Sequence, residues 1–404
     1  MKASKYSANY QDFLWAVKLN RYSLELSGLW PKSKQTNWEK RMCNLRTFLT
    51  FSTIVFAILI PALHSLIRIY SDILLMIDNL QYTIVMIICV IKIIIFWWKK
   101  TVITPVIDMI MNDWTKTKTP QERTIMIARA RTARIIASVA YVIMAGAMSV
   151  SIGMSMFGYS MRYVTNVTDP GRILPYQSYY IYDVTKSPQY ELTFTSQAIT
   201  MILCAMLYTG VDNFLSLVVF HICGQLDILK NRLIHMNKTN YLNVLKSVVM
   251  DHIQLFSFLL YRAIAIIKDT YSALFLILFT LFGSLCICYG FLLTNMFEDG
   301  YHISFSQLAF LVTIVTNIFG HMCMYCALGE FLTAQCDQIH YAAYCNEWYI
   351  TDPRNARCLV LLMIRTNKPL YLSAGRVFPL TMATFCNLIK TSAGYISVLL
   401  TKKN

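Results

Sequence analysis

Seven runs of mostly apolar residues, each close to or above the length that crosses a lipid bilayer, dominate this sequence of 404 residues. A transmembrane helix needs about 20 such residues. The composition agrees, because only 14% of the residues are charged, whereas soluble domains average roughly a quarter. The sequence therefore predicts an all-α membrane protein with seven transmembrane helices, at residues 44–68, 73–98, 134–160, 193–221, 272–296, 305–330 and 376–401.

The basic residues predict the orientation of these helices. The first 43 residues and the loops 99–134, 222–271 and 331–376 contain 8, 8, 6 and 5 Lys or Arg, whereas the other three loops contain 1, 3 and 0. Cytoplasmic loops carry the excess of positive charge, so we expect a cytoplasmic N-terminus and an extracellular C-terminus. The net charge of +15 is explained by this pattern, and no nucleic-acid partner is expected. Asn166 begins a glycosylation sequon in a loop that this topology places outside.

Three helical patterns continue well beyond the bilayer. Residues 191–236 contain no proline, and a helix of that length would reach about 69 Å, against a hydrocarbon core of ~30 Å. Residues 256–297 and 306–349 are also free of proline. We expect helices 4–6 to project into the cytosol and pack there as an anchor bundle. The alternative is a helix break in each inner loop.

Three polar features in or beside the apolar runs allow two interpretations each. Lys92 lies near the basic end of the second run, where snorkelling to the headgroups is favoured over a functional charge. Asp78, in the same run, fits either a structural hydrogen bond or a position in an outer vestibule. The outer loop from Leu174 to Tyr190 is rich in tyrosine, and it could cover an apolar cavity or rest among the headgroups.

The last apolar run carries a narrow stripe of small and polar residues. At 100° per residue the stripe covers about 80° of a helix, and it consists of Asn387, Thr391, Gly394, Val398 and Thr401. Taken alone, such a stripe favours a helix-packing seam, but it also suits a helix that lines a water-filled pore. In a pore, a ring of Val398 side chains could close the path by dewetting.

Several short motifs point to one family. They are Leu19-Asn20-Arg21, Gly28-Leu29-Trp30-Pro31, Tyr344-Cys345-Asn346-Glu347-Trp348-Tyr349, Pro369, Leu372, Ala374-Gly375-Arg376, Phe378, Thr384-Phe385 and Lys390-Thr391-Ser392-Ala393-Gly394-Tyr395. With the predicted topology, these motifs resemble the insect odorant receptor family. The chain lacks the Gln-Phe pattern of the related gustatory receptors and the long loop insertion of the odorant receptor co-receptor (Orco). It therefore looks like a ligand-tuning subunit, similar to hymenopteran members.

The resemblance implies an odorant-gated, non-selective cation channel, built as a heterotetramer with the co-receptor in the plasma membrane of an olfactory neuron dendrite. It implies a small apolar odorant or pheromone as the ligand and membrane lipid as a partner, with no cofactor and no metal. The stripe on the last helix would line the pore, with Val398 as the gate. The pocket would lie in the outer half of spans 2, 3, 4 and 6, which contribute Leu80, Thr83, Met148, Ser151, Met154, Gln197, Met201, Phe310 and Thr313.

The expected organisation has four parts. Residues 1–43 would form a cytoplasmic segment, 44–330 the first six transmembrane helices with the pocket, 331–375 the anchor region, and 376–404 the last helix with a short outer tail. A G-protein-coupled receptor would need an outside N-terminus, which the count of basic residues opposes. A secondary transporter would show internal repeats, and we find none in this sequence. The scattered histidines form no Ser/His/Asp or metal spacing, so we do not expect an enzyme.

Overall fold

The computed structural model describes residues 2–32, 35–116, 118–160, 172–176, 178–234, 254–298, 304–345, 349, 353–367 and 371–403. Their elements, in chain order, are α1 (Lys2–Leu26), α2 (Asn37–Ile54), the π-helical turn η1 (Val55–Leu59), α3 (Ile60–Arg68), α4 (Ile73–Thr115), α5 (Pro120–Met156), α6 (Gln189–Ile234), α8 (Gln254–Glu298), α9 (Phe305–Tyr344), α10 (Pro353–Thr366), the strands β1 (Ser373–Ala374) and β2 (Phe378–Pro379), and α11 (Met382–Lys403).

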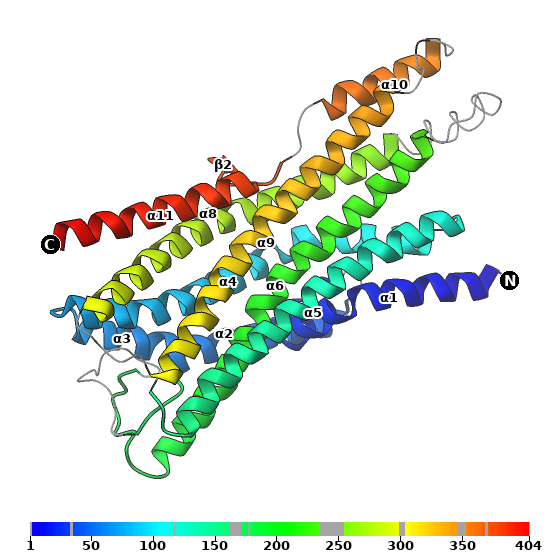
Figure 1. Ribbon diagram of the computed structural model, residues 1–404. Helices are drawn as coiled ribbons and strands as arrows, with labels where there is room; N and C mark the ends of the chain where they lie inside the picture. The colour runs from blue at the N-terminus through cyan, green and yellow to red at the C-terminus, as the bar shows by residue number, and fades with distance from the viewer. Residues whose placement is uncertain are drawn as a thin grey trace.

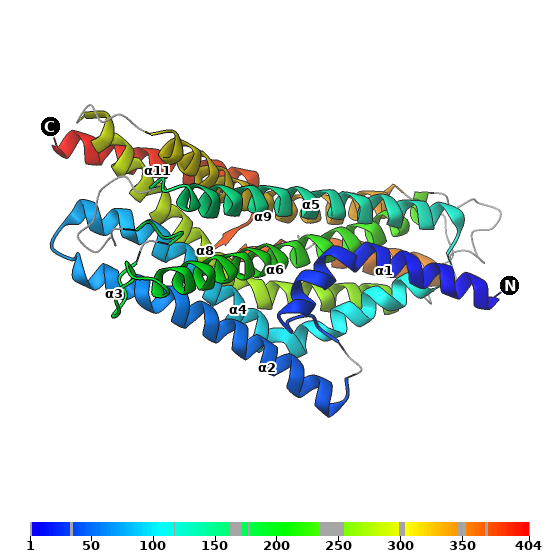
Figure 2. The ribbon, with the colours of Figure 1, turned by 90° about the horizontal axis from the view of Figure 1, so that it is seen from below.

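The long helices run side by side around α6 (Figures 1 and 2). The apolar window of α6 is 83% buried, whereas that of α5 is only 17% buried, so α6 is the central helix and α5 lies on the outside. α6 packs against α1, α4, α5 and α9. The two ends of the chain lie at opposite ends of the bundle (Figure 1).

The prediction of an all-α membrane protein is confirmed. Within the described residues, six helices are long and apolar enough to cross a membrane, and the first of them runs without a break from Asn37 through η1 to Arg68. The seventh predicted run corresponds to α11, which does not meet these criteria. It begins at Met382 rather than at 376, because β1 and β2 form a tight antiparallel hairpin just before it. Gly375 and Arg376 turn this hairpin with φ angles of 57° and 61°.

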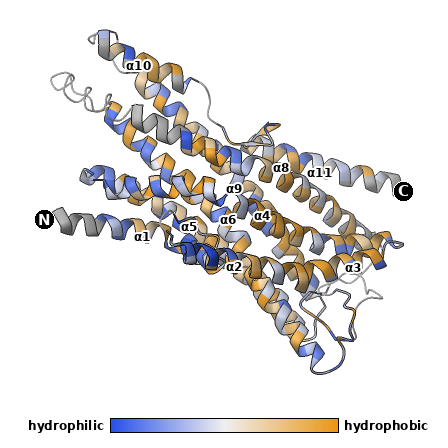
Figure 3. Cartoon of the chain, turned by 180° about the vertical axis from the view of Figure 1, so that it is seen from behind, coloured by the Kyte–Doolittle hydropathy of each residue, from blue (hydrophilic) through white to orange (hydrophobic). Residues whose placement is uncertain are grey.

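The helices are as long as the proline-free patterns predicted. α6, α8 and α9 contain 46, 45 and 40 residues, so each reaches about 60 Å or more. The predicted loop at 99–134 is largely helical instead: α4 extends to Thr115 and α5 begins at Pro120. Apolar residues dominate the half of the bundle near the C-terminus, and polar residues are more frequent toward the N-terminal end (Figure 3).

Ion pairs tie the helices together in the polar half. Arg129 of α5 contacts Asp227 of α6 at 2.6 Å, and Arg232 of α6 contacts Glu122 at the start of α5. Burial opposes the ionisation of Glu122, but hydrogen bonds from Thr119 and Arg232 outweigh it and hold the pKa of Glu122 below its usual value. The basic residues of the predicted inner loops therefore also join neighbouring helices.

The motif that begins with Gly28 docks α1 on the bundle. Gly28 adopts a φ of +75°, which ends the helix in the left-handed conformation that glycine adopts without strain. The amides of Leu29 and Trp30 donate to Leu24 O at 2.8 and 3.1 Å. Both side chains are buried, and the ring of Trp30 meets the edge of Phe214 on α6.

Alanine at Gly28 should destabilise the protein more than alanine at Gly158. Both glycines have a positive φ, but a Cβ at Gly28 would lie 2.3 Å from Cys43 O, whereas a Cβ at Gly158 meets nothing within 4 Å. Gly158→Ala should therefore cost only the left-handed strain of about 1–2 kcal/mol. Gly28→Ala should add roughly 1–3 kcal/mol of overlap. Thermal unfolding of the detergent-solubilised protein would measure both, and equal losses would contradict this explanation of the motif.

Candidate ligand-binding site

A largely apolar cavity of about 120 Å³ lies between five helices and the outer loop. The helices α4, α5, α6, α8 and α9 all contribute to its wall, and residues 175–176 of the loop contribute too. The wall consists of Gln81, Tyr82, Val85, Met86, Ile88, Cys89, Met144, Ala147, Met148, Ser151, Pro175, Tyr176, Met201, Cys204, Ala205, Tyr208, Phe282, Phe310, Thr313, Ile314, Asn317 and Ile318.

Aromatic rings form one side of the cavity. Tyr82 of α4 stacks on Phe310 of α9, with ring centroids 5.0 Å apart and an interplanar angle of 16°. Tyr176 approaches the same Tyr82 ring edge-on at 6.0 Å. Such pairs add about 0.5–1.5 kcal/mol beyond area burial, so they hold α4, α9 and the outer loop around a rigid wall.

The outer loop covers the cavity because Gln197 of α6 holds it there. The side chain of Gln197 accepts a hydrogen bond from Tyr176 N at 2.9 Å and donates to Tyr176 O at 2.8 Å. It also donates to the hydroxyl of Tyr180 at 2.6 Å. Pro175 and Tyr176 thus belong to a lid, which is one of the two alternatives that the tyrosine-rich loop suggested.

Methionines supply much of the remaining wall. Met86, Met144, Met148 and Met201 reach the cavity from three different helices. Methionine side chains are unbranched and polarisable, so they adapt to ligands of different shape. A cavity of this kind selects its ligand mainly by size and shape, and the few polar groups in its wall decide orientation.

A buried ion pair lies directly beneath the cavity. Lys92 Nζ is 2.6 Å from Asp212 Oδ2, with side-chain exposures of 0% and 1%. The ammonium also lies 3.2 Å from the centroid of the Tyr208 ring, which lines the cavity. His321 Nε2 lies 3.3 Å from the same Asp212 oxygen, and Lys92 donates to Tyr325 OH at 3.3 Å. The snorkelling interpretation of Lys92 is therefore wrong, because an acidic partner on α6 keeps the charge inside.

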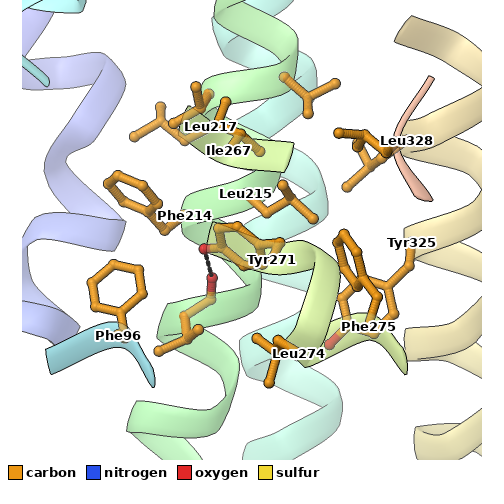
Figure 4. Close-up of a cluster of buried hydrophobic side chains, with 14 of the residues drawn as sticks. Phe96, Phe214, Leu215, Leu217, Ile267, Tyr271, Leu274, Phe275, Tyr325 and Leu328 are labelled. Atoms are coloured by element: carbon orange, nitrogen blue, oxygen red, sulfur yellow. Dashed lines mark hydrogen bonds between the residues drawn. The ribbon is translucent and has the colours of Figure 1, made fainter. Parts of the chain in front are cut away.

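A cluster of buried aromatic and aliphatic side chains adjoins this ion pair through Tyr325, which accepts a hydrogen bond from Lys92 (Figure 4). Phe96, Phe214, Tyr271 and Phe275 are all almost fully buried, and Phe275 packs on Tyr325 at 5.3 Å. The hydroxyl of Tyr271 donates to Val211 O at 3.0 Å, so this polar group is satisfied inside the core.

The structure brings five of the nine predicted pocket residues into the wall, namely Met148, Ser151, Met201, Phe310 and Thr313. The other four do not line the cavity. Thr83 is fully buried and donates to Asn79 O at 3.0 Å, and Gln197 lies behind the lid. Leu80 and Met154 are half-buried elsewhere.

Sequence reasoning missed Gln81, Tyr82, Tyr208 and the α8 residue Phe282. The cavity residues of α4 share one face of the helix, and their helical spacing is visible in the sequence. They are Gln81, Tyr82, Val85, Ile88 and Cys89. That face could not be identified, because α4 is apolar on every side and its polar residues are scattered. Asp212 was also overlooked, although it is a carboxylate inside the fourth apolar run.

The five predicted pore residues lie far from this wall, on α11. Asn387, Thr391, Gly394, Val398 and Thr401 are all exposed in the single chain, whereas Phe385, Leu388 and Ser392 face the bundle. Asn166, the predicted glycosylation site, lies outside the described residues.

Long apolar helices around a mainly apolar cavity define a multi-pass membrane protein with a ligand-sized site. The sequence model of the family described as 7tm Odorant receptor matches residues 72–393, and the chain belongs to this family. Odorant receptor 10 of Aedes albopictus is 28% identical over 227 residues, covering 54% of this chain and 57% of the relative. Odorant receptor 9a of Drosophila melanogaster is 25% identical over 236 residues, covering 56% and 55%. The matched part spans little more than half the length of either relative.

Solved structures share the fold over nearly the whole chain. The insect olfactory receptor OR5 from Machilis hrabei superposes with a TM-score of 0.80 at 16% identity, covering 97% of this chain and 99% of that one. The same receptor in complex with eugenol gives a TM-score of 0.76, also at 16% identity, over 96% and 97%.

Removing one member of the buried ion pair should destabilise the protein by about 3–5 kcal/mol, because the other charge is left buried. Asp212→Leu should be worse than Lys92→Met, since Asp212 keeps its contact with His321 when the lysine is lost. The double variant should recover much of the loss, because two apolar side chains replace the pair. Thermal unfolding of the three variants gives the ranking, and a double variant with fully additive losses would argue against the pair.

Proposed function

We propose that this chain is the ligand-tuning subunit of an odorant-gated, non-selective cation channel. A small apolar odorant or pheromone binds in the cavity beneath the lid, and α11 lines the central pore of a heterotetramer formed with the co-receptor. The location is the plasma membrane of an olfactory neuron dendrite, with the N-terminus inside. Family membership, the mainly apolar cavity and the arrangement of α11 support this proposal together.

The observation that carries it is the exposed stripe on α11. A helix-packing seam would need neighbours close to its small residues, but a Cβ built on Gly394 meets nothing within 4 Å. Val398 is 63% exposed, although it is apolar. The stripe therefore has no packing role within the described chain, and the lining of a pore would account for its small and polar residues.

The chemistry of the stripe suits passing cations. Thr391 and Thr401 donate their hydroxyl protons to Asn387 O and Ser397 O, at 2.8 and 2.9 Å. Each hydroxyl oxygen keeps acceptor capacity that faces away from its own backbone, and such oxygens can replace water around a cation. α11 contains no Asp or Glu, which fits a pore without strong selectivity by fixed charge.

Gating follows from a difference in affinity between two states of the channel. An odorant that fits the open form better than the closed form shifts the population toward the open form. About 2 kcal/mol of preference multiplies the open-to-closed ratio roughly thirtyfold for one occupied subunit. The Machilis hrabei receptor has been solved in complex with eugenol, and the aromatic wall of this chain's cavity supports the binding of a small aromatic ligand.

Expression with the co-receptor in cells that lack other odorant receptors should give odorant-evoked cation currents. The currents should persist under G-protein blockade, because the receptor itself forms the conducting path. Whole-cell recording with and without the co-receptor provides the measurement. Currents that disappear under the blockade would favour the G-protein-coupled alternative, and uptake without a channel-like current would favour a transporter.

Val398→Ser should increase the current in the absence of odorant, because a polar ring at the gate lowers the barrier from dewetting. Ala393→Ser is the matched control, since it adds a hydroxyl to α11 off the stripe and should leave the resting current unchanged. Patch-clamp recording of the complex with the co-receptor measures both. Equal behaviour of the two variants would remove Val398 as the gate.

A further inference from the structure

The side-chain amide oxygen of Gln81, a residue of the cavity wall, has no hydrogen-bond partner among the described residues. Gln81 of α4 lines the cavity and is fully buried. Its Nε2 donates to Asp78 Oδ1 at 2.8 Å, whereas its Oε1 is buried and accepts no hydrogen bond from the described residues. Burying an amide oxygen without a partner is unfavourable, so this arrangement calls for an explanation.

Asp78, the partner of the Gln81 amide nitrogen, determines which atom of the Gln81 amide remains without a hydrogen bond. The NH2 group of Gln81 is the donor in its hydrogen bond with Asp78, as an ionised carboxylate requires, because such a group can only accept. The reverse orientation would bring two acceptor oxygens together. The amide is thereby oriented with Oε1 as its unused end, in a residue that belongs to the cavity wall.

Two other polar side chains near the cavity already have partners. Thr313 donates its hydroxyl proton to Ala309 O at 2.7 Å. The amide of Gln197 is used at both ends to hold the lid. Gln81 Oε1 differs from both groups because it offers a complete, uncommitted acceptor in mainly apolar surroundings.

We propose that Gln81 Oε1 is the hydrogen-bond acceptor for the ligand, and that the cavity is tuned to ring-sized odorants with one hydroxyl or N–H donor. This rests on the proposed function, namely that odorants bind in this cavity. The size agrees, because the cavity of about 120 Å³ is slightly smaller than an engineered apolar cavity of about 150 Å³ that binds benzene. Small alcohols and phenols therefore form the expected class.

A ligand without a donor would fill the space but leave the acceptor unpaired. Sites built to bond a hydroxyl reject analogues that lack it more strongly than apolar pockets reject a size change. For one neutral hydrogen bond, the expected discrimination is on the order of tenfold in affinity.

Phenol, toluene and anisole test the inference, because they share a ring and only phenol donates. Headspace partition of each probe into nanodiscs that contain the full receptor complex, corrected for empty nanodiscs, measures binding. The phenol-to-toluene ratio in the wild type should exceed the ratio in Gln81→Met about tenfold. Dividing the two ratios removes the different hydration of the probes.

Asp78→Asn is the second variant and gives a sharper outcome. Its side-chain NH2 can donate to Gln81 Oε1, so the Gln81 amide can rotate and turn its own NH2 toward the cavity. The preference for phenol should then fall and binding of anisole, an acceptor, should rise. Met148→Leu is the matched control, since a change in the apolar wall should shift all three probes alike.

The outcomes separate this inference from the proposed function. If the wild type takes up phenol and toluene equally beyond their lipid partition, or if neither polar variant changes the ratio, Gln81 is not the ligand acceptor. In that case a cavity-filling Met148→Trp that still abolishes uptake of the probes would leave the proposed function intact. No uptake of any probe by the wild type, together with no odorant-evoked current, would remove both.

Discussion

The ion pair between Lys92 of α4 and Asp212 of α6 is the interaction on which the rest of the structure depends. Both charges are buried, at 0% and 1% exposure, in a region that offers few other partners. Helices that are apolar on most sides can shift and rotate against one another at little cost in free energy. A buried polar pair favours the one relative position of the two helices in which both charges meet. We infer that this pair aligns α4 and α6. The pair also contacts α9, through His321 and Tyr325.

The same pair defines the inner limit of the cavity. The Lys92 ammonium lies against the face of Tyr208, so a ring of the cavity wall also contacts the buried charge. Cation–π contacts of this kind strengthen when water is excluded, and both side chains are buried, at 0% and 5% exposure. The cavity thus lies between a hydrogen-bonded lid held by Gln197 and a floor held by an ion pair. The cavity wall is mostly apolar because most of the nearby polar groups take part either in the hydrogen bonds of the lid or in the contacts of the ion pair.

The sequence predicted the helices well and the site only in part. Proline-free apolar runs correctly indicated α6, α8 and α9, because length and composition act locally. Lys92 was misread, because its partner Asp212 lies 120 residues further along and only the packing of α4 on α6 brings them together. Leu80 and Thr83 were selected in place of Gln81 and Tyr82 for a related reason. A one-residue change rotates the chosen face by 100°, and a helix surrounded by apolar neighbours gives no sign of which face meets a cavity.

Both α8, through Phe282, and α9 form part of the cavity wall and pack against α11, and α9 carries polar contacts as well. Its outer part carries Phe310, Thr313 and Asn317 in the cavity wall, and its middle carries His321 beside the ion pair. Further along, the carboxylate of Glu330 accepts a hydrogen bond from Met382 N, the first amide of α11, at 2.8 Å. A carboxylate at a helix N-terminus is favoured by the helix dipole, so this contact couples the position of α11 to that of α9. Because all three contacts are on one helix, a movement of Phe310 along α9 would act on either the ion pair or the start of α11. We infer that the second is the easier movement, since the Glu330 contact is exposed while the ion pair is enclosed by packed rings.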